Sequence, residues 1–202
     1  MKKTIFLLLT LAIPVSIFLF LKFFGTNTFE VPCLFDEGIP DCVDSSSPHI
    51  VPVVEYIGGE AKNLISSDLN GFLVFGVLYG TDLENNEDKM RELVRIQDAF
   101  YEVGSPHFVL FPHEELGDIR GLMELCTEYG LEQKNYSLVN LKEEKLMEFL
   151  RCGIALIDNV NSEFDNLVLV DPEKRIRGIY NSKDIEQTDK LILELKILKQ
   201  NM

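Results

Sequence analysis

Four polar side chains at alternate positions follow an apolar run near the middle of this 202-residue chain and could bind a hard cation. They are Asp82, Glu84, Asn86 and Asp88. A calcium loop also needs a glycine at its sixth position and a glutamate at its twelfth, where a loop starting at Asp82 has Glu87 and Leu93. Because an aspartate at the start of a helix also accepts hydrogen bonds from free backbone N–H groups, capping by Asp82 is the favoured interpretation.

The cysteines are candidates for redox or metal chemistry. Cys33 and Cys42 lie in a turn-rich stretch and are separated by eight residues. In an oxidising compartment this spacing favours a structural disulfide between Cys33 and Cys42. Copper ligation by Cys33, Cys42 and His49 is an alternative. Cys126 and Cys152 lie among apolar residues, so we expect both to be small core side chains and not reactive thiols.

Two further histidines complete the set of ionisable imidazoles. His113 ends a predicted strand, at the edge where the loop around Asp82 should also emerge. A ligand or acid–base role is therefore open to His113, although its Pro-His-Glu-Glu context is also typical of an exposed loop. His107 has no recognisable partner. The chain contains no Gly-rich phosphate loop and no helical HxxxH pair.

A strand, a loop and a helix between residues 71 and 100 would position the acidic and amide side chains. The apolar run from Phe72 to Tyr79 predicts a strand that is buried on both faces. A helical stripe follows, formed by Met90, Leu93, Ile96, Gln97 and Phe100. In an open α/β sheet, ligands bind in loops that follow the carboxyl ends of strands. The loop from Gly80 to Asp88 is therefore the expected site.

The remaining elements predict one mixed sheet with helices on both faces. A hairpin is expected at Val51–Ile65, strands at His107–Phe111 and Tyr136–Val139, helices at Asp118–Tyr129 and Lys142–Arg151, a closing hairpin at Leu167–Tyr180, and a last helix at Asp184–Gln200. In the helix expected at Asp118–Tyr129, the predicted core face is Ile119, Leu122, Met123 and Cys126. The last helix is expected to begin with Asp184 and Gln187 as a capping pair and to bury Ile185.

The N-terminus carries an apolar segment of the length that crosses a bilayer. Residues Thr4–Leu21 contain no charge, and Phe23 and Phe24 extend the segment. Because no small-x-small cleavage site follows, a retained anchor over residues 4–24 is favoured over a cleaved signal peptide. Lys2 and Lys3 precede the segment and acids follow it, which predicts a cytoplasmic N-terminus and a soluble domain on the periplasmic side.

The charge of the chain excludes nucleic acid as an expected partner. The formal net charge is −14, and 16 basic against 33 acidic side chains remain after the three lysines of the first 25 residues. A phosphate backbone requires the opposite sign. The composition then predicts three parts: an anchor at 1–24, a tether or irregular arm at 25–50, and a folded domain at 51–202.

Several stretches together resemble the Sco/SenC family of membrane-anchored copper chaperones. They are SPHIVPVVEY, DLNGFLVFGVLYGTD, RIQDAF, TEYGLEQKNYSLV and LVLVDPEKRIRGIYN, and the Arg-Ile-Arg-Gly hairpin is the most specific part. The likeness covers nearly the whole chain. It implies a thioredoxin-like α/β fold and an extracytoplasmic domain. Members bind copper through a CxxxC motif and a distant histidine, and they help assemble cytochrome oxidase or exchange thiols and disulfides.

The chain departs from the family pattern at the functional positions. Alignment without a gap places Asp82 and Asn86 where the two cysteines belong, and Glu163 nearest to the histidine. A carboxylate, an amide and a carboxylate form a hard oxygen set that suits copper(I) poorly. Thiol redox chemistry at this loop needs a thiol. A peroxidase of the same fold superclass would also need a cysteine near the start of the central helix, where the sequence has none.

These observations predict a membrane-anchored, non-catalytic protein with a pseudo-active site and no cofactor. Its expected role is to contact a protein partner, such as a respiratory oxidase subunit or an assembly factor, in oxidase assembly or envelope maintenance. The alternative is an active copper-binding or thiol–disulfide protein that uses relocated Cys33 and Cys42. Copper would then be its cofactor.

Overall fold

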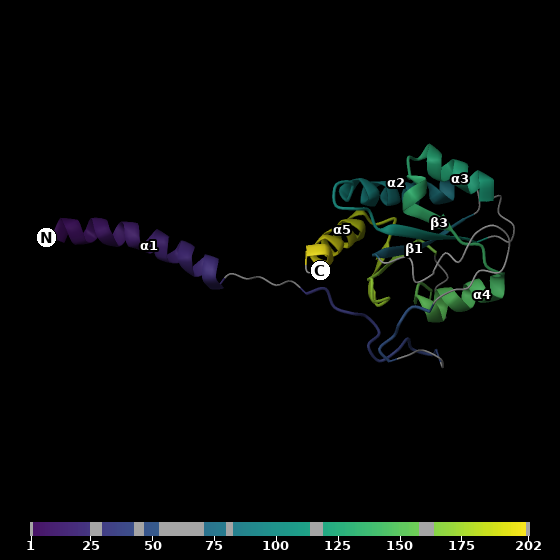
Figure 1. The fold of residues 1–202 in the computed structure, drawn as a ribbon, viewed down its shortest axis with the longest axis horizontal. Coiled ribbons are helices and arrows are strands. Elements are labelled where there is room, and N and C mark those ends of the chain that lie inside the picture. Colours follow the sequence, from purple (N-terminus) through teal and green to yellow (C-terminus); the bar gives the residue numbers. More distant parts are fainter. Residues whose placement is uncertain are drawn as a thin grey trace. The chain divides into compact units, whose positions relative to one another are not determined.

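The computed structural model describes residues 2–24, 30–42, 47–52, 71–79, 83–113, 119–157 and 164–200 (Figure 1). The chain divides into two units, Met1–Glu30 and Val31–Met202. The first unit contains helix α1 (Lys2–Phe24), which includes Pro14. Over the residues that the structure describes, no helix combines the length and the apolar content needed to cross a membrane.

The second unit is built on a mixed five-stranded sheet in the order β3-β2-β1-β4-β5. The strands are β1 (Leu73–Leu78), β2 (His107–Pro112), β3 (Tyr136–Leu138), β4 (Asn166–Val170) and β5 (Ile176–Asn181). Strands β1, β2 and β3 run parallel, whereas β4 is antiparallel to both β1 and β5. The carboxyl ends of β1 and β2 therefore meet at one edge of the sheet.

Helices cover both faces of this sheet (Figure 1). They are α2 (Leu83–Ala99), α3 (Ile119–Glu128), α4 (Glu143–Glu148) and α5 (Ile185–Gln200), with the short turns η1 (Gln133–Asn135) and η2 (Phe149–Gly153). Helices α2, α3 and α5 pack on one face, and α4 with η2 packs on the other. The α/β architecture predicted from the sequence is confirmed.

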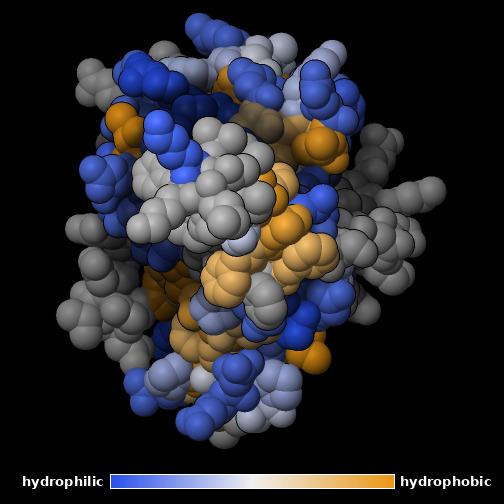
Figure 2. Space-filling view, turned by 90° about the vertical axis from the view of Figure 1, so that its left-hand side faces the viewer, coloured by the Kyte–Doolittle hydropathy of each residue, from blue (hydrophilic) through white to orange (hydrophobic). Residues whose placement is uncertain are grey.

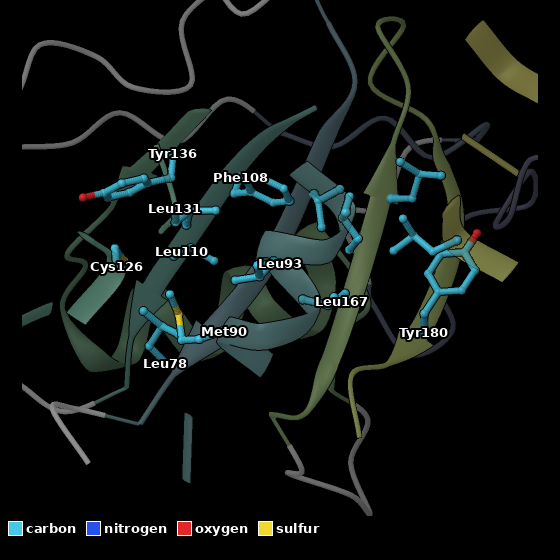
Figure 3. Close-up of a cluster of buried hydrophobic side chains, with 14 of the residues drawn as sticks. Leu78, Met90, Leu93, Phe108, Leu110, Cys126, Leu131, Tyr136, Leu167 and Tyr180 are labelled. Carbon is cyan, nitrogen blue, oxygen red and sulfur yellow. The ribbon is translucent and has the colours of Figure 1, made fainter. Parts of the chain in front are cut away.

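Strand β1 is buried along its whole length because apolar side chains leave it on both faces. Val74 and Leu78 enter the core under α2, while Phe75 and Val77 enter the core under α4. Figure 3 shows the first of these cores, where Met90 and Leu93 of α2 lie between labelled side chains of the strands. The buried stripe of α2 is thus confirmed.

Gln97 is the polar member of that stripe, and it is also buried. Its Nε2 donates to Gly130 O at 3.1 Å, and its Oε1 accepts from Glu132 N at 2.8 Å. Asn135 Nδ2 donates to the same Oε1 at 3.0 Å. Gln97 therefore joins α2 to the turn that follows α3.

Two helix faces differ from the sequence prediction. In α3 the buried residues are Leu122, Leu125 and Cys126, whereas Ile119 and Met123 are 38% and 36% exposed. The inward stripe is centred one residue later than the apolar pattern suggested. In α5, Ile185 is 64% exposed because it is the first residue of the helix. The expected cap of α5 is present: Asp184 Oδ1 accepts from Glu186 N at 3.0 Å.

The predicted tether, residues 25–50, includes a stretch that packs on the sheet. We call residues 31–42 and 47–52 the arm. Leu34 N donates to Ile176 O at 2.8 Å, and Val51 N donates to Lys174 O at 2.9 Å. The arm therefore lies along β5 and its preceding turn. Beyond Pro52, the predicted hairpin lies outside the described residues.

The surface reflects the polar composition of the chain. Figure 2 shows both blue hydrophilic and orange hydrophobic residues on the drawn face. Exposed large apolar side chains of the second unit include Tyr101, Val103 and Leu193.

Asp171 explains the Arg-Ile-Arg sequence of the closing hairpin. Its carboxylate is buried, accepts from Arg175 Nε at 3.0 Å and from Arg177 Nε at 2.7 Å, and also accepts from Arg175 N at 2.8 Å. Arg177 Nη1 in turn donates to Val31 O at 2.8 Å. One carboxylate thus orients both arginines, and one of them holds the start of the arm.

Replacing Asp171 by alanine is expected to lower the free energy of unfolding by about 3 kcal/mol, because it leaves a mostly buried guanidinium without its counter-charge. Urea denaturation measures the change. The matched control is Glu173→Ala, which removes the exposed carboxylate that pairs with Arg175 at 3.2 Å. An exposed pair contributes about 1 kcal/mol or less. Equal losses in the two variants would contradict the central role of Asp171.

Candidate functional site

The candidate site is the edge of the sheet where β1 and β2 end, here called the carboxyl edge. Tyr79 follows β1 and His113 follows β2, and the pairing of Leu78 with Pro112 brings them side by side. The ring centroids of Tyr79 and His113 are 6.0 Å apart, and that of Phe164 is 4.3 Å from the His113 ring. Three segments far apart in sequence therefore meet in one aromatic cluster.

Asn86 closes the gap between the end of β1 and the first turns of α2. Its side chain is fully buried. Oδ1 accepts from Tyr79 N at 2.9 Å, and Nδ2 donates to Tyr79 O at 3.1 Å. The amide pairs with the backbone of Tyr79 much as a neighbouring strand would. Neither its oxygen nor its nitrogen can turn to a ligand without breaking this pairing.

Replacing Asn86 by alanine is expected to cost about 2 kcal/mol of unfolding free energy, since it removes two hydrogen bonds to the part-buried backbone of Tyr79. Chemical denaturation monitored by circular dichroism measures the loss. Glu87→Ala is the control, because Glu87 is half-exposed and pairs only on the surface of α2 with Arg91. An Asn86→Ala variant as stable as the control would exclude this bridging role.

Lys89 places an ammonium group inside the carboxyl edge. The side chain is 2% exposed, and Nζ donates to Val77 O at 2.6 Å and to Phe164 O at 2.5 Å. It also lies 5.5 Å from the centroid of the Tyr79 ring. Burial lowers the pKa of Lys89 to about 8, although nearby Asp165 opposes the shift. Lys89 therefore joins α2, the end of β1 and the start of β4.

Asp165 provides a counter-charge to Lys89 at this edge. Its Oδ2 lies 2.7 Å from Lys183 Nζ, and its backbone oxygen accepts from Ser182 Oγ at 2.6 Å. These contacts fix the entry to β4 against the end of β5. The edge thus contains two ammonium groups around one buried carboxylate.

His113 has an unsatisfied atom. Its backbone N–H donates to Leu78 O at 2.9 Å, but in the described part of the chain no hydrogen-bond partner is found for the buried Nδ1. The sequence left open a ligand or acid–base role for His113. The position of its buried Nδ1 at this edge is compatible with such a role. Of the other residues assigned to the site, Asp82 and Glu163 lie outside the described residues, so capping by Asp82 stays a prediction.

The disulfide prediction is wrong in its pairing. Cys42 is bonded to Cys152, with a Cα–Cα distance of 5.6 Å, and Cys33 is a free thiol. The arm runs back to η2, where His49 Nε2 lies 2.8 Å from Gly153 O. A partner 110 residues away cannot be inferred from local spacing. Cys152 is therefore not the free core thiol that was expected.

The other thiol and the metal candidates can also be placed. Cys126 is fully buried in the core under α2 and α3, as predicted, and burial raises its pKa to about 11. The copper set of Cys33, Cys42 and His49 is not available in this state, since Cys42 is in the disulfide. Among the described residues, no group of three histidine, cysteine or acidic side chains could hold a metal ion.

Sequence reasoning missed the role of Lys89. A signal was present, because Asn86, Lys89 and Leu93 fall at helical spacing on the inward side of α2. A lysine on an otherwise apolar stripe requires a buried partner. The partners of Lys89 are the backbone carbonyls of Val77 and Phe164. Every residue has a backbone carbonyl, so the residue types in the sequence do not identify these partners.

Comparisons with known proteins bear on the fold. Neither the family models nor the curated proteins give a match. A SCO1/SenC family lipoprotein from Bacillus anthracis has a similar solved structure, with a TM-score of 0.53 and 15% identity over 63% of this chain and 80% of that one. The structure of BsSco, described as a member of the Sco family of cytochrome c oxidase assembly proteins, is also similar. Its TM-score is 0.54, and its sequence is 16% identical over 66% of this chain and 84% of that one.

The copper-bound ScoI of Arabidopsis thaliana is a third similar structure, with a TM-score of 0.50 and 12% identity over 65% of this chain and 85% of that one. At such identities, the likeness concerns the fold. The chain has the thioredoxin-like fold of these SCO1/SenC proteins, as its sequence predicted.

Proposed function

We propose that this chain is a membrane-anchored, extracytoplasmic counterpart of the SCO1/SenC proteins that works by binding a protein partner and not by copper or thiol chemistry at the carboxyl edge. The observation that carries the proposal is the bonding of Asn86 and Lys89. Both side chains are buried, and both are engaged by backbone groups of neighbouring segments. The polar groups of Asn86 and Lys89 at the carboxyl edge are therefore used in internal hydrogen bonds, as polar groups in a protein core are.

The residues present at this edge do not fit a copper(I) ion. Copper(I) prefers thiolate, thioether and imidazole ligands. His113 supplies an imidazole, but the aligned second cysteine position is Asn86, and Lys89 adds a buried positive charge. A like charge close to a buried ammonium is strongly disfavoured at low dielectric. Asn86 at the aligned cysteine position therefore removes a copper ligand, and the ammonium group of Lys89 would repel a copper ion.

Copper(I) titration of the segment from Thr26 to Met202 against a competing chelator tests the absence of a metal role. We expect no stoichiometric binding, with the disulfide intact or reduced. A free-thiol count run in parallel identifies the cysteines that are available. Tight one-to-one binding that Cys33→Ser abolishes would overturn the proposal and support the alternative, in which copper binds at relocated cysteines of the arm.

The membrane part of the proposal rests on the sequence. Residues Thr4–Leu21 are uncharged, and Lys2 and Lys3 precede them. This pattern favours an anchor with its N-terminus in the cytoplasm. Alkaline extraction of membranes tests it: the full chain should stay in the pellet and the segment from Thr26 onward should be released. Release of both would remove the anchor from the proposal.

The partner class follows from the similar structures. BsSco belongs to a family of cytochrome c oxidase assembly proteins, and a chain that keeps the fold without the ligands can keep its contacts. We propose a respiratory oxidase subunit or an assembly factor as the partner. Periplasmic proximity labelling from the C-terminus, with a fusion that ends at Glu30 as control, should enrich such proteins only for the full chain. Identical labelled sets would contradict this partner class.

A further inference from the structure

Three of the four cysteines lie in the arm or in the turn that the arm contacts. Cys42 of the arm is bonded to Cys152 of η2. Cys33, on the same arm, remains a free and partly exposed thiol. One disulfide and one thiol on the same short segment form the minimum set for an internal exchange of disulfide partners.

The surroundings of Cys33 are charged. Burial opposes the charge of the Arg175 guanidinium, but Asp171, Cys33 and Glu173 together outweigh this effect and raise the pKa of Arg175. The sulfur of Cys33 is therefore coupled electrostatically to a cation held by Asp171. The thiolate is the form of a cysteine that attacks disulfides.

The backbone between Cys33 and Cys42 is held in a conformation that its residues disfavour. Phe35 has a φ of 63° and Asp41 a φ of 62°. A left-handed conformation costs about 1 kcal/mol or more for a residue with a side chain, most for a bulky one such as phenylalanine. Phe35 O accepts from Gly38 N at 3.0 Å and from His49 N at 3.0 Å, which helps to hold this shape. Phe35, two residues from Cys33, is thus joined through His49 to Gly153, the residue that follows Cys152.

We propose that the arm is a thiol–disulfide switch in which Cys33 displaces Cys152 from Cys42. The Cys33 thiolate attacks Cys42 Sγ, the Cys42–Cys152 bond breaks as the Cys33–Cys42 bond forms, and Cys152 leaves as a thiolate. The proton lost by Cys33 passes through solvent to Cys152. The chain contains one disulfide before and after, so no oxidant or reductant is consumed.

The exchange would change how the arm is held. In the described state a covalent bond and the His49–Gly153 contact hold the arm to η2. After exchange, the bond lies within the arm, across a loop of eight residues, and Cys152 presents a thiol. The contacts of the arm with β5 and its preceding turn, through Leu34 and Val51, do not depend on the disulfide. The switch therefore frees one side of the arm.

Native alkylation of the oxidised full chain at mildly alkaline pH, followed by peptide mapping, tests the exchange. We expect labelling of Cys33 in molecules that keep the Cys42–Cys152 bond and of Cys152 in molecules that contain a Cys33–Cys42 bond, and never of both in one molecule. Cys33→Ser leaves the described disulfide intact and should slow labelling of Cys152 at least about tenfold, the factor that corresponds to about 1.4 kcal/mol. The buried Cys126 reports unfolding, because it reacts only when the core opens.

Each outcome decides the proposal. Labelling of Cys152 that is unaffected by Cys33→Ser, or that begins only together with Cys126, would overturn it. A second variant does not depend on the displacement of Cys152. In Cys152→Ser, mild oxidation should close the Cys33–Cys42 bond within one chain. If both thiols then stay open to alkylation, Cys33 cannot reach Cys42 and the switch is excluded.

Discussion

Removing the Cys42–Cys152 disulfide is expected to lower the free energy of unfolding of the second unit by about 4 kcal/mol. The bond joins residues 110 positions apart, so it restricts a long stretch of the unfolded chain. It also fixes the arm to η2 beside the buried His49. Few single changes elsewhere in the described structure should cost as much.

The loss of unfolding free energy is best measured in variants that cannot form the alternative Cys33–Cys42 disulfide. Urea denaturation of Cys33→Ser is compared with that of Cys33→Ser/Cys42→Ser, because neither variant can form the Cys33–Cys42 bond. Cys33→Ser in reductant should match the double variant, and without reductant it should unfold like the oxidised wild type. Coincident curves for the single and double variants in the absence of reductant would contradict a stabilising disulfide.

Lys89 is expected to make the stability of the domain depend on pH in the alkaline range. Burial lowers its pKa from 10.5 to about 8 in the folded state. Between these values the unfolded chain binds a proton that the folded chain lacks, so a rise in pH stabilises the fold. One pKa unit corresponds to about 1.4 kcal/mol, and the contribution of Lys89 should therefore grow by about 2 kcal/mol from pH 8 to pH 9.5.

A comparison of variants isolates this contribution from other groups. Burial also raises the pKa of Tyr180 and of Cys126, and these groups reduce stability as the pH increases above their unfolded values. We therefore expect the difference in unfolding free energy between wild type and Lys89→Met to shift in favour of wild type as the pH rises. Lys190→Met, which removes an exposed lysine of α5, is the control. A difference that stays constant with pH would show that Lys89 keeps its ordinary pKa.

Lys89 also shows why the structure of the carboxyl edge could be inferred only in part. The sequence predicts that Asp82 and Asn86 stand where the Sco/SenC pattern has its two cysteines, and thiol redox chemistry at that loop would need a thiol. The replacement of ligands by internal bonds is not visible there. It depends on Tyr79 and Phe164, whose backbone groups face α2 only after the sheet has formed.

The sequence by itself determined the elements and the layered α/β architecture. Strand and helix periods are local, because each buried face repeats every two or 3.6 residues, and β1 and α2 follow these rules closely. Only the tertiary structure decided the Cys42–Cys152 bond, the course of the arm along β5, and the cluster of Tyr79, His113 and Phe164. These contacts join segments far apart along the chain. Their formation depends on how whole layers pack, which no local pattern encodes.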